Sequence, residues 1–201
     1  DKISGQGNWP SAFALFTYAA GFSFAYVSLP TATGALLLFG AVQATMITYG
    51  LATGERLQKL QLFGLALAFG GLIGLLLPGL SAPPLHGSLL MLAAGAAWGV
   101  YSLRGSSRDS LRDKGAGDPT GVTAGNFLRT VPIAVIFSLL MLNDMSLDTA
   151  GILYAVSSGA LASGIGYTIW YMALPALKAT QAATVQLSVP VIAALGGVVF
   201  L

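Results

Sequence analysis

Charged residues and cysteines are the groups that this sequence has least of. Only 8% of its 201 residues are Asp, Glu, Lys or Arg, against about 25% in an average soluble domain. A chain with so little charge cannot cover its surface with groups that suit water. The absence of cysteine excludes disulfides and thiolate metal sites.

Catalytic groups are also missing. No Asp or Glu lies well inside an apolar run, and the sequence has no nucleophile paired with a base, no H-E-x-x-H pattern, no phosphate loop and no metal-ligand cluster. The single histidine, His86, stands alone at the edge of an apolar run. We therefore expect no enzyme, no cofactor and no ATP-driven pump.

Long apolar runs dominate instead, and hydrophobic residues make up 55% of the chain. A membrane-spanning helix needs about 20 apolar residues. We predict spans at 11–28, 33–53, 60–78, 87–103, 120–142, 150–173 and 179–201. The expected fold is an all-α integral membrane protein, a polytopic bundle of about seven transmembrane helices. Pro132 and Pro190 should kink their helices, and Asp118 and Asp148 are expected N-caps.

Basic residues fall on one side of the predicted alternation. They precede the first span or lie between spans two and three, four and five, and six and seven: Lys2, Arg56, Lys59, Arg104, Arg108, Arg112, Lys114 and Lys178. The positive-inside rule then places the N-terminus in the cytoplasm, and we expect a bacterial inner membrane. Residues 1–10 are polar, so we expect no signal peptide.

One hairpin pattern occurs twice. Residues 12–49 and 160–201 each consist of two apolar runs broken by a Leu-Pro pair, with ATGA at 32–35 and ATQA at 179–182. The first copy begins on the cytoplasmic side and the second begins on the other. Such inverted repeats are typical of secondary transporters.

Four stretches resemble the EamA-type branch of the drug/metabolite transporter superfamily. They are LLLFGAVQATMITYGLATGERL (36–57), GLALAFGGLIGLLLPG (64–79), AAGAAWGVYSLRG (93–105) and GIGYTIWYMALPALKATQAATVQLSVPVIAALGG (164–197). The resemblance implies a 5+5 inverted-repeat fold, of which this chain holds helices three to nine. We expect 1–79 to be the remainder of the first repeat and 80–201 to be the second repeat without its last helix.

The resemblance further implies a secondary transporter that moves small organic solutes, such as amino acids, drugs or organic ions, by alternating access. The alternative is a non-transporting membrane scaffold or partner subunit. The expected partners are a small-molecule solute and the lipid bilayer, and a homodimer stays open. We expect no nucleic-acid partner, because the basic residues flank the membrane.

Arg129 is the only Arg, Lys, Asp or Glu well inside a predicted span. It lies ~13 Å from the start of its span at 1.5 Å per residue, where a charge is costly and usually faces a cavity or a partner. One interpretation is an anion contact, with Asn126 one turn earlier on the same face. The alternative is that Arg129 reaches the headgroups or backbone carbonyls near Pro132.

Aromatic and amide side chains supply the other candidates. Trp98, Tyr101, Tyr167 and Trp170 could line a cavity, although an aromatic belt is an alternative, most of all for Tyr101 and for Tyr171. Tyr18, Phe22 and Tyr26 form a stripe that we expect to be core or belt.

Gln43 and Gln186 lie deep in their spans and either touch solute or bond neighbouring helices, whereas Gln181 is expected to bond a helix. Glu55 is expected to pair with Arg56 or Lys59 or to sit in the headgroups. Three G-x-x-x-G pairs predict close helix approach: Gly70/Gly74, Gly95/Gly99 and Gly121/Gly125.

Overall fold

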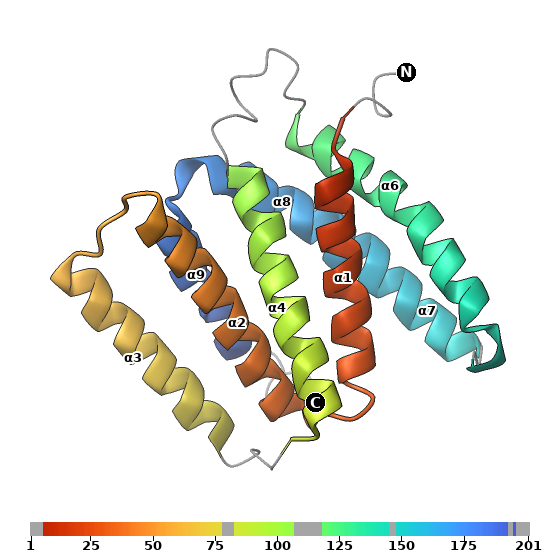
Figure 1. The fold of residues 1–201 in the computed structure, drawn as a ribbon, viewed down its shortest axis with the longest axis horizontal. Helices are drawn as coiled ribbons and strands as arrows, with labels where there is room; N and C mark the ends of the chain where they lie inside the picture. The colour runs from red at the N-terminus through yellow and green to blue at the C-terminus, as the bar shows by residue number, and fades with distance from the viewer. Residues whose placement is uncertain (1–5, 78–82, 107–117, 145–147, 193–194, 196–201) are drawn as a thin grey trace. The chain divides into compact units, whose positions relative to one another are not determined.

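The computed structural model describes residues 6–77, 83–106, 118–144, 148–192 and 195, and all regular structure within these ranges is helical. Figure 1 labels the helices: α1 (Trp9–Ala25), α2 (Thr31–Ala52), α3 (Lys59–Leu76), α4 (Leu85–Ser106), α6 (Pro119–Leu140), α7 (Thr149–Ser157), α8 (Gly166–Ala173) and α9 (Ala179–Gln186). Within these ranges each predicted span contains helix, with α7, the intervening π-helix and α8 forming one segment, so the all-α class is confirmed; residues 193–194 and 196–201 of the last predicted span lie outside the described residues.

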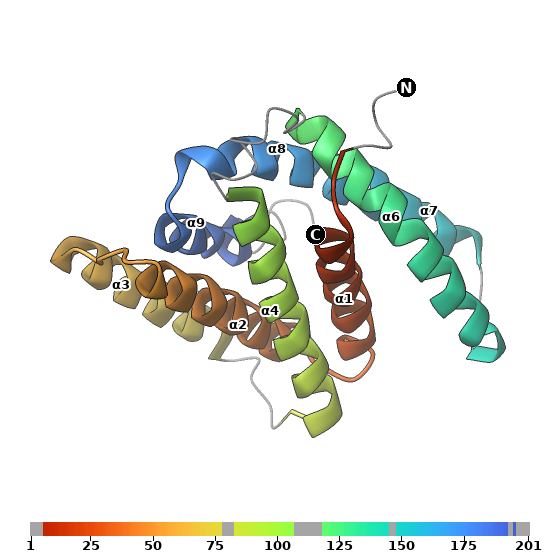
Figure 2. The ribbon, with the colours of Figure 1, turned by 45° about the horizontal axis from the view of Figure 1, so that its top comes forward.

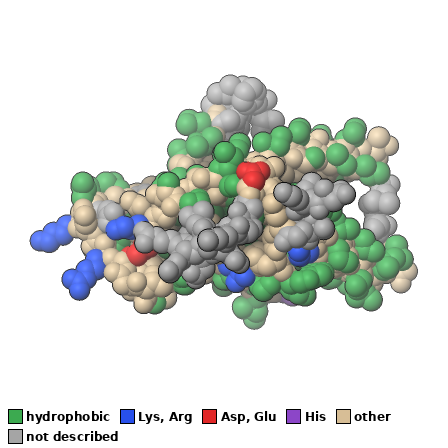
Figure 3. Space-filling view, turned by 90° about the horizontal axis from the view of Figure 1, so that it is seen from above, with side chains coloured by type: hydrophobic (Ala, Val, Ile, Leu, Met, Phe, Trp, Pro, Cys, Tyr) green, Lys and Arg blue, Asp and Glu red, His purple; other side chains and the backbone are tan. Residues whose placement is uncertain are grey.

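Three helical segments in the described part of the chain are long and apolar enough to cross a membrane, judged by length and composition. They are Thr31–Ala52, Pro119–Leu140 and Thr149–Ala176. Large hydrophobic side chains are widely exposed; Leu60 is 80% and Tyr154 77% exposed. Figure 3 shows hydrophobic side chains open on the face drawn, alongside separate groups of Lys, Arg and acidic side chains. This surface suits lipid.

The chain divides into two compact units, which are described separately. One unit comprises Asp1–Phe16 and Arg104–Ala176, and the other comprises Thr17–Leu103 and Leu177–Leu201. Each unit combines two segments that are separated in the sequence. The proposed repeat boundary between residues 79 and 80 therefore stays a prediction.

The unit that contains α2 is built on a close contact between α2 and α9, and α3 also packs against α2 (Figures 1 and 2). A cluster of buried apolar residues joins the end of α1, α2 and α4: Ala25, Leu29, Leu38, Met91 and Ala94. The expected stripe of Tyr18, Phe22 and Tyr26 packs against this cluster. The stripe is therefore core packing.

Glycine lets α4 approach α2. A Cβ at Gly95 would lie 2.6 Å from the Cβ of Ala41, and one at Gly99 would lie 2.9 Å from the Cβ of Thr45. Real Cβ atoms do not come so close, so any larger residue would push the helices apart. The Gly95/Gly99 pair thus has the role that its spacing predicts.

In the other unit, α6 lies along α8 (Figures 1 and 2). Asp148 caps α7 as predicted, because its Oδ1 accepts from the Gly151 N–H. Asp118 stands at the N-cap position of α6, but its side chain makes no capping hydrogen bond. Pro132 lies inside α6 without ending it.

Two breaks are visible in the later spans. A π-helix, Ser158–Ile165, separates α7 from α8 and was not predicted. In the last span, α9 ends at Gln186, and helix resumes at 188–192. This break lies where Pro190 clashes with the carbonyl four residues earlier and cannot donate to it. The kink expected at Pro190 stays a prediction.

Candidate functional site

The end of α2 directs an acidic side chain toward the start of α9. Gly54 has a φ of 91°, a left-handed conformation that ends the helix. The Glu55 N–H then bonds the Gly50 carbonyl at 2.8 Å. This local turn carries Glu55 past the end of α2.

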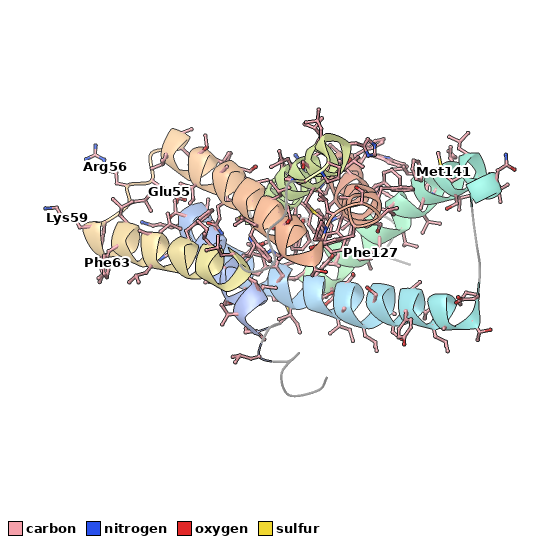
Figure 4. The ribbon with its side chains drawn as sticks, turned by 90° about the horizontal axis from the view of Figure 1, so that it is seen from below. Glu55, Arg56, Lys59, Phe63, Phe127 and Met141 are labelled. Carbon is pink, nitrogen blue, oxygen red and sulfur yellow. The ribbon has the colours of Figure 1, made fainter. Side chains whose placement is uncertain are left out.

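The Glu55 carboxylate caps α9 from a distant part of the chain. Its Oε1 accepts from the Ala179 N–H at 2.9 Å, and its Oε2 accepts from the Thr180 N–H at 3.1 Å and the Thr180 hydroxyl at 2.8 Å. Arg56 and Lys59 point away from α9 (Figure 4). Glu55 is therefore a helix cap and not the partner of Arg56 or Lys59, which was the first of the two roles that we expected.

A sequence signal for this cap existed. The residue before α9 is Lys178, whose side chain cannot accept a hydrogen bond from the free N–H groups of the helix. Gln181 supplies one local contact, since its Oε1 accepts from the Lys178 N–H at 2.9 Å. A helix start without its own acidic or hydroxyl cap invites a carboxylate from elsewhere.

Opposing effects set the pKa of Glu55. Burial alone would raise the pKa of its carboxyl group, but the hydrogen bonds from Thr180 and Ala179 and the charge of Lys178 outweigh burial. The pKa of Glu55 therefore lies below its ordinary value, and the carboxylate stays ionised at neutral pH.

Deeper along the same two helices, amide side chains link α2 to α9. The Gln43 Nε2 donates to the Ala183 carbonyl, and the Gln186 Nε2 donates to the Met46 sulfur at 3.2 Å. Gln43 and Met46 are one turn apart on α2, and Ala183 and Gln186 are one turn apart on α9. Two such contacts in successive turns hold the pair of helices in register.

Trp98 of α4 joins this network, because its indole N–H donates to the Gln186 Oε1. An indole can only donate and a carbonyl can only accept. The amide atom of Gln186 that faces the Trp98 indole must therefore be its oxygen. The amide atom of Gln43 that faces the Ala183 carbonyl must be its nitrogen. The ring of Trp98 lies 4.9 Å from that of Tyr18 and 5.7 Å from that of Tyr101.

Tyr101 is fully buried, so it does not form an aromatic belt at the lipid boundary. Tyr171, in the other unit, is also buried. The structure thus brings four of the predicted site residues together: Gln43, Gln186, Trp98 and Tyr101. Sequence reasoning did not anticipate Met46 or Ala183, because neither has a polar side chain to mark it.

One acceptor in this cluster is unsatisfied. Gln43 is 2% exposed, and its Oε1 has no hydrogen-bond partner among the described residues. A buried carbonyl left without a donor costs about 1–3 kcal/mol. This atom is the strongest candidate in the cluster for contact with a bound solute.

In the other unit, Asn126 and Arg129 serve the N-terminal segment. The Asn8 N–H donates to the Asn126 Oδ1 at 3.0 Å. The Arg129 Nη1 donates to the carbonyls of Gln6 and Gly125. Contact with backbone carbonyls was one alternative for Arg129, although the carbonyls are not those near Pro132.

The last two predicted residues lie on α8 in the same unit. The Tyr167 ring lies 6.0 Å from that of Phe127 of α6, which Figure 4 labels, and Trp170 is half-buried. Their role in binding stays a prediction. Among the described residues, no group of three His, Asp or Glu side chains could hold a metal ion.

These features define a multi-pass helical membrane protein with a polar cluster between its helices. The chain belongs to the EamA-like transporter family, whose model matches residues 85–201. The resemblance seen in the sequence is thereby confirmed.

Two curated relatives extend beyond this chain. It is 57% identical over 196 residues to an uncharacterized protein of Pseudomonas aeruginosa, covering 98% of this chain and 66% of the relative. An uncharacterized transporter of Archaeoglobus fulgidus is 26% identical over 180 residues, covering 87% and 60%. The chain therefore spans 66% of the first relative's length and 60% of the second's. A solved crystal structure with 23% identity shares the fold, with a TM-score of 0.76 over 94% of this chain and 67% of its own.

Proposed function

We propose that the full-length protein is a secondary carrier that moves small organic solutes by alternating access. The observation that carries this proposal is the buried Gln43 Oε1, which has no donor among the described residues. A group of this kind needs an explanation in a folded protein. A solute N–H placed in the cluster would satisfy it.

The chemistry of the cluster favours a particular kind of solute. Gln43 offers an acceptor, and Trp98 offers an aromatic face on which a flat or cationic group can rest. The described cluster contains no carboxylate or cation. We therefore infer amines, amino acids and aromatic metabolites with an N–H donor as the substrate class.

The membrane setting is part of the same proposal. We place the protein in a bacterial inner membrane with its N-terminus in the cytoplasm, because its basic loops fall on one side of the predicted spans. Cysteine scanning with an impermeant reagent on intact cells tests this orientation. Labelling of a cysteine at Arg56 from outside the cell would reverse it.

The second candidate is a membrane scaffold that transports nothing. It is favoured by the fact that Gln43 and Gln186 each bond a neighbouring helix. Such bonds stabilise membrane helices by about 0.6 kcal/mol on average. In that case the two glutamines contribute only to helix packing.

Solute flux separates the two candidates. The full-length protein in proteoliposomes is assayed with radiolabelled amines, amino acids and aromatic metabolites. Gln43→Met should weaken the apparent affinity roughly tenfold, the equivalent of one hydrogen bond of about 1.4 kcal/mol. Gln58→Met, in the loop after α2, is the control and should leave uptake unchanged. If no solute crosses faster than through empty vesicles, the scaffold is the better account.

A further inference from the structure

The span Thr149–Ala176 changes its hydrogen-bond repeat in the middle. α7 ends at Ser157, the π-helix covers Ser158–Ile165, and α8 begins at Gly166, in one continuous stretch of helix (Figure 1). A π-helix bonds each N–H to the carbonyl five residues earlier, is rare, and occurs mostly as short breaks at functional sites. It is also one of the few recognised causes of a sharp helix bend. The change of repeat therefore marks a place where this span can bend.

Three glycines lie in the π-helix or directly after it: Gly159, Gly164 and Gly166. A Cβ at Gly159 or Gly166 would meet no heavy atom of the described residues within 4 Å, apart from its chain neighbours and its own helix backbone. One at Gly164 would make only an ordinary contact, 3.4 Å from the Gly159 carbonyl oxygen. These positions thus differ from Gly95, where small size permits a close approach. The property of glycine that remains to explain them is its backbone freedom, which makes it a poor helix former.

The two ends of the π-helix are held differently. No residue from 149 to 165, a range that the structure describes in full, is buried. By contrast, α8 lies along α6, its Tyr171 is buried, and its Tyr167 ring lies 6.0 Å from that of Phe127. A bend at the π-helix would therefore move α7 while α8 keeps its contacts with α6.

A side chain supplies a hydrogen bond at the point where the ladder changes. The Thr168 hydroxyl donates to the Gly164 carbonyl at 2.8 Å. A backbone carbonyl without a donor is costly in a membrane, and Ser or Thr hydroxyls are a usual replacement where a helix is broken. Hydroxyls bonded to the carbonyl four residues earlier are also found in bent helices. The Gly164 carbonyl therefore keeps a donor when the backbone ladder opens at this turn.

We propose that Ser158–Ile165 is a hinge at which α7 bends relative to α8. The glycines supply the backbone freedom, and Thr168 bonds the carbonyl that bending releases. A role of this bending in transport rests on the proposed carrier function, which solute flux tests on its own. Bending without flux would keep the hinge and remove the carrier.

The distance between spin labels on the two sides of the π-helix tests the hinge. The full-length protein, freed of other cysteines, is labelled at Leu153→Cys and Met172→Cys, each of which replaces a side chain that is 62% exposed. These positions would be ~29 Å apart in a straight α-helix at 1.5 Å per residue. Pulsed electron paramagnetic resonance in liposomes should give a broad or two-peaked distribution. Gly159→Ala with Gly166→Ala should narrow it to a single peak, because alanine has room at both positions and favours regular helix.

Matched variants separate the hinge from general effects on helices. Gly70→Ala with Gly74→Ala should leave the distribution unchanged, although these positions of α3 are equally open. Thr168→Val should shift the distribution toward the narrow form, because the released carbonyl would have no donor. Thr184→Val removes the same kind of bond, to the Thr180 carbonyl of α9, and should have no effect.

Four results would overturn the proposal. A single narrow distribution in the labelled protein without further substitutions would show a rigid span. Equal effects of the two glycine pairs, or of the two threonine variants, would show that the π-helix has no special part in the motion. A melting temperature that falls with the alanines at Gly159 and Gly166, but not with the control pair, would mean that another helix of the full-length protein packs on these glycines.

Discussion

The carboxylate of Glu55 accepts two hydrogen bonds from Thr180, one from its backbone N–H and one from its hydroxyl. The two residues are 125 positions apart. The contact is close-fitting, because a Cβ on Gly50 would lie 2.9 Å from the Thr180 methyl group. The end of α2 and the start of α9 are thus joined by a cap that neither helix has within its own sequence.

Removal of this cap should destabilise α9. We expect Glu55→Ala to cost about 0.5–2 kcal/mol, the usual effect of losing a helix N-cap. The measurements are the melting temperature of the protein and hydrogen exchange of the Ala179 and Thr180 amides. Asp118→Ala is the matched control, since Asp118 holds an N-cap position without a side-chain bond. Equal effects of the two variants would contradict the cap.

The same cap should weaken in acid. The pKa of Glu55 is lowered on folding because the hydrogen bonds and Lys178 outweigh burial. A group of this kind adds stability above its unfolded-state pKa and loses that stability as pH falls through its lower folded-state pKa.

Hydrogen exchange of the first turn of α9, corrected for intrinsic rates, should therefore rise below the ordinary pKa range of a glutamate. Glu55→Gln should raise exchange at neutral pH and remove this pH dependence. A pH response that survives Glu55→Gln would assign the effect to another group.

The helices could be predicted from the sequence because the length of an apolar run is a local signal. Within the described residues, each of the seven predicted spans contains helix, and Gly95/Gly99 serve the close approach that their spacing indicates. The contacts of the candidate site could not be predicted in the same way. Gln43 could bond a helix or a solute equally well until Ala183 was found opposite its amide.

Local patterns also failed where two sites look alike. Asp118 and Asp148 both precede a helix, yet only Asp148 bonds the first turn. Glu55 has two cations close in sequence and instead bonds α9, because the turn at Gly54 directs it there. In each case the deciding factor is backbone geometry rather than residue type.

The contact between α4 and α2 should not tolerate a side chain at Gly95. Gly95→Ala places a methyl group 2.5 Å from the Leu38 carbonyl, which belongs to a helix backbone and cannot rotate away. We expect a loss of about 1–3 kcal/mol from overpacking. Gly40→Ala, whose Cβ would meet nothing within 4 Å, should be neutral or stabilise the helix by up to about 1 kcal/mol. Thermal unfolding in detergent compares them.

Gln186→Leu should leave the Trp98 indole without its acceptor. We expect a loss of about 1 kcal/mol, because the half-buried indole would lose its hydrogen bond to Gln186. The indole N–H resonance of Trp98 should move in the NMR spectrum, while those of Trp9 and Trp170 stay in place. A spectrum in which the Trp98 resonance does not move would show that the bond to Gln186 is absent in the membrane protein.

Arg129 should anchor the N-terminal segment to α6 through the carbonyls of Gln6 and Gly125. Arg129→Met should therefore speed hydrogen exchange in residues 8–12. Arg129→Lys separates this role from anion binding, because lysine keeps the charge but lacks the planar fork of five donors. If Arg129 is an anchor, lysine leaves exchange fast. If Arg129 instead binds an anionic solute, lysine should restore the KM for anionic solutes while exchange in residues 8–12 stays slow in every variant.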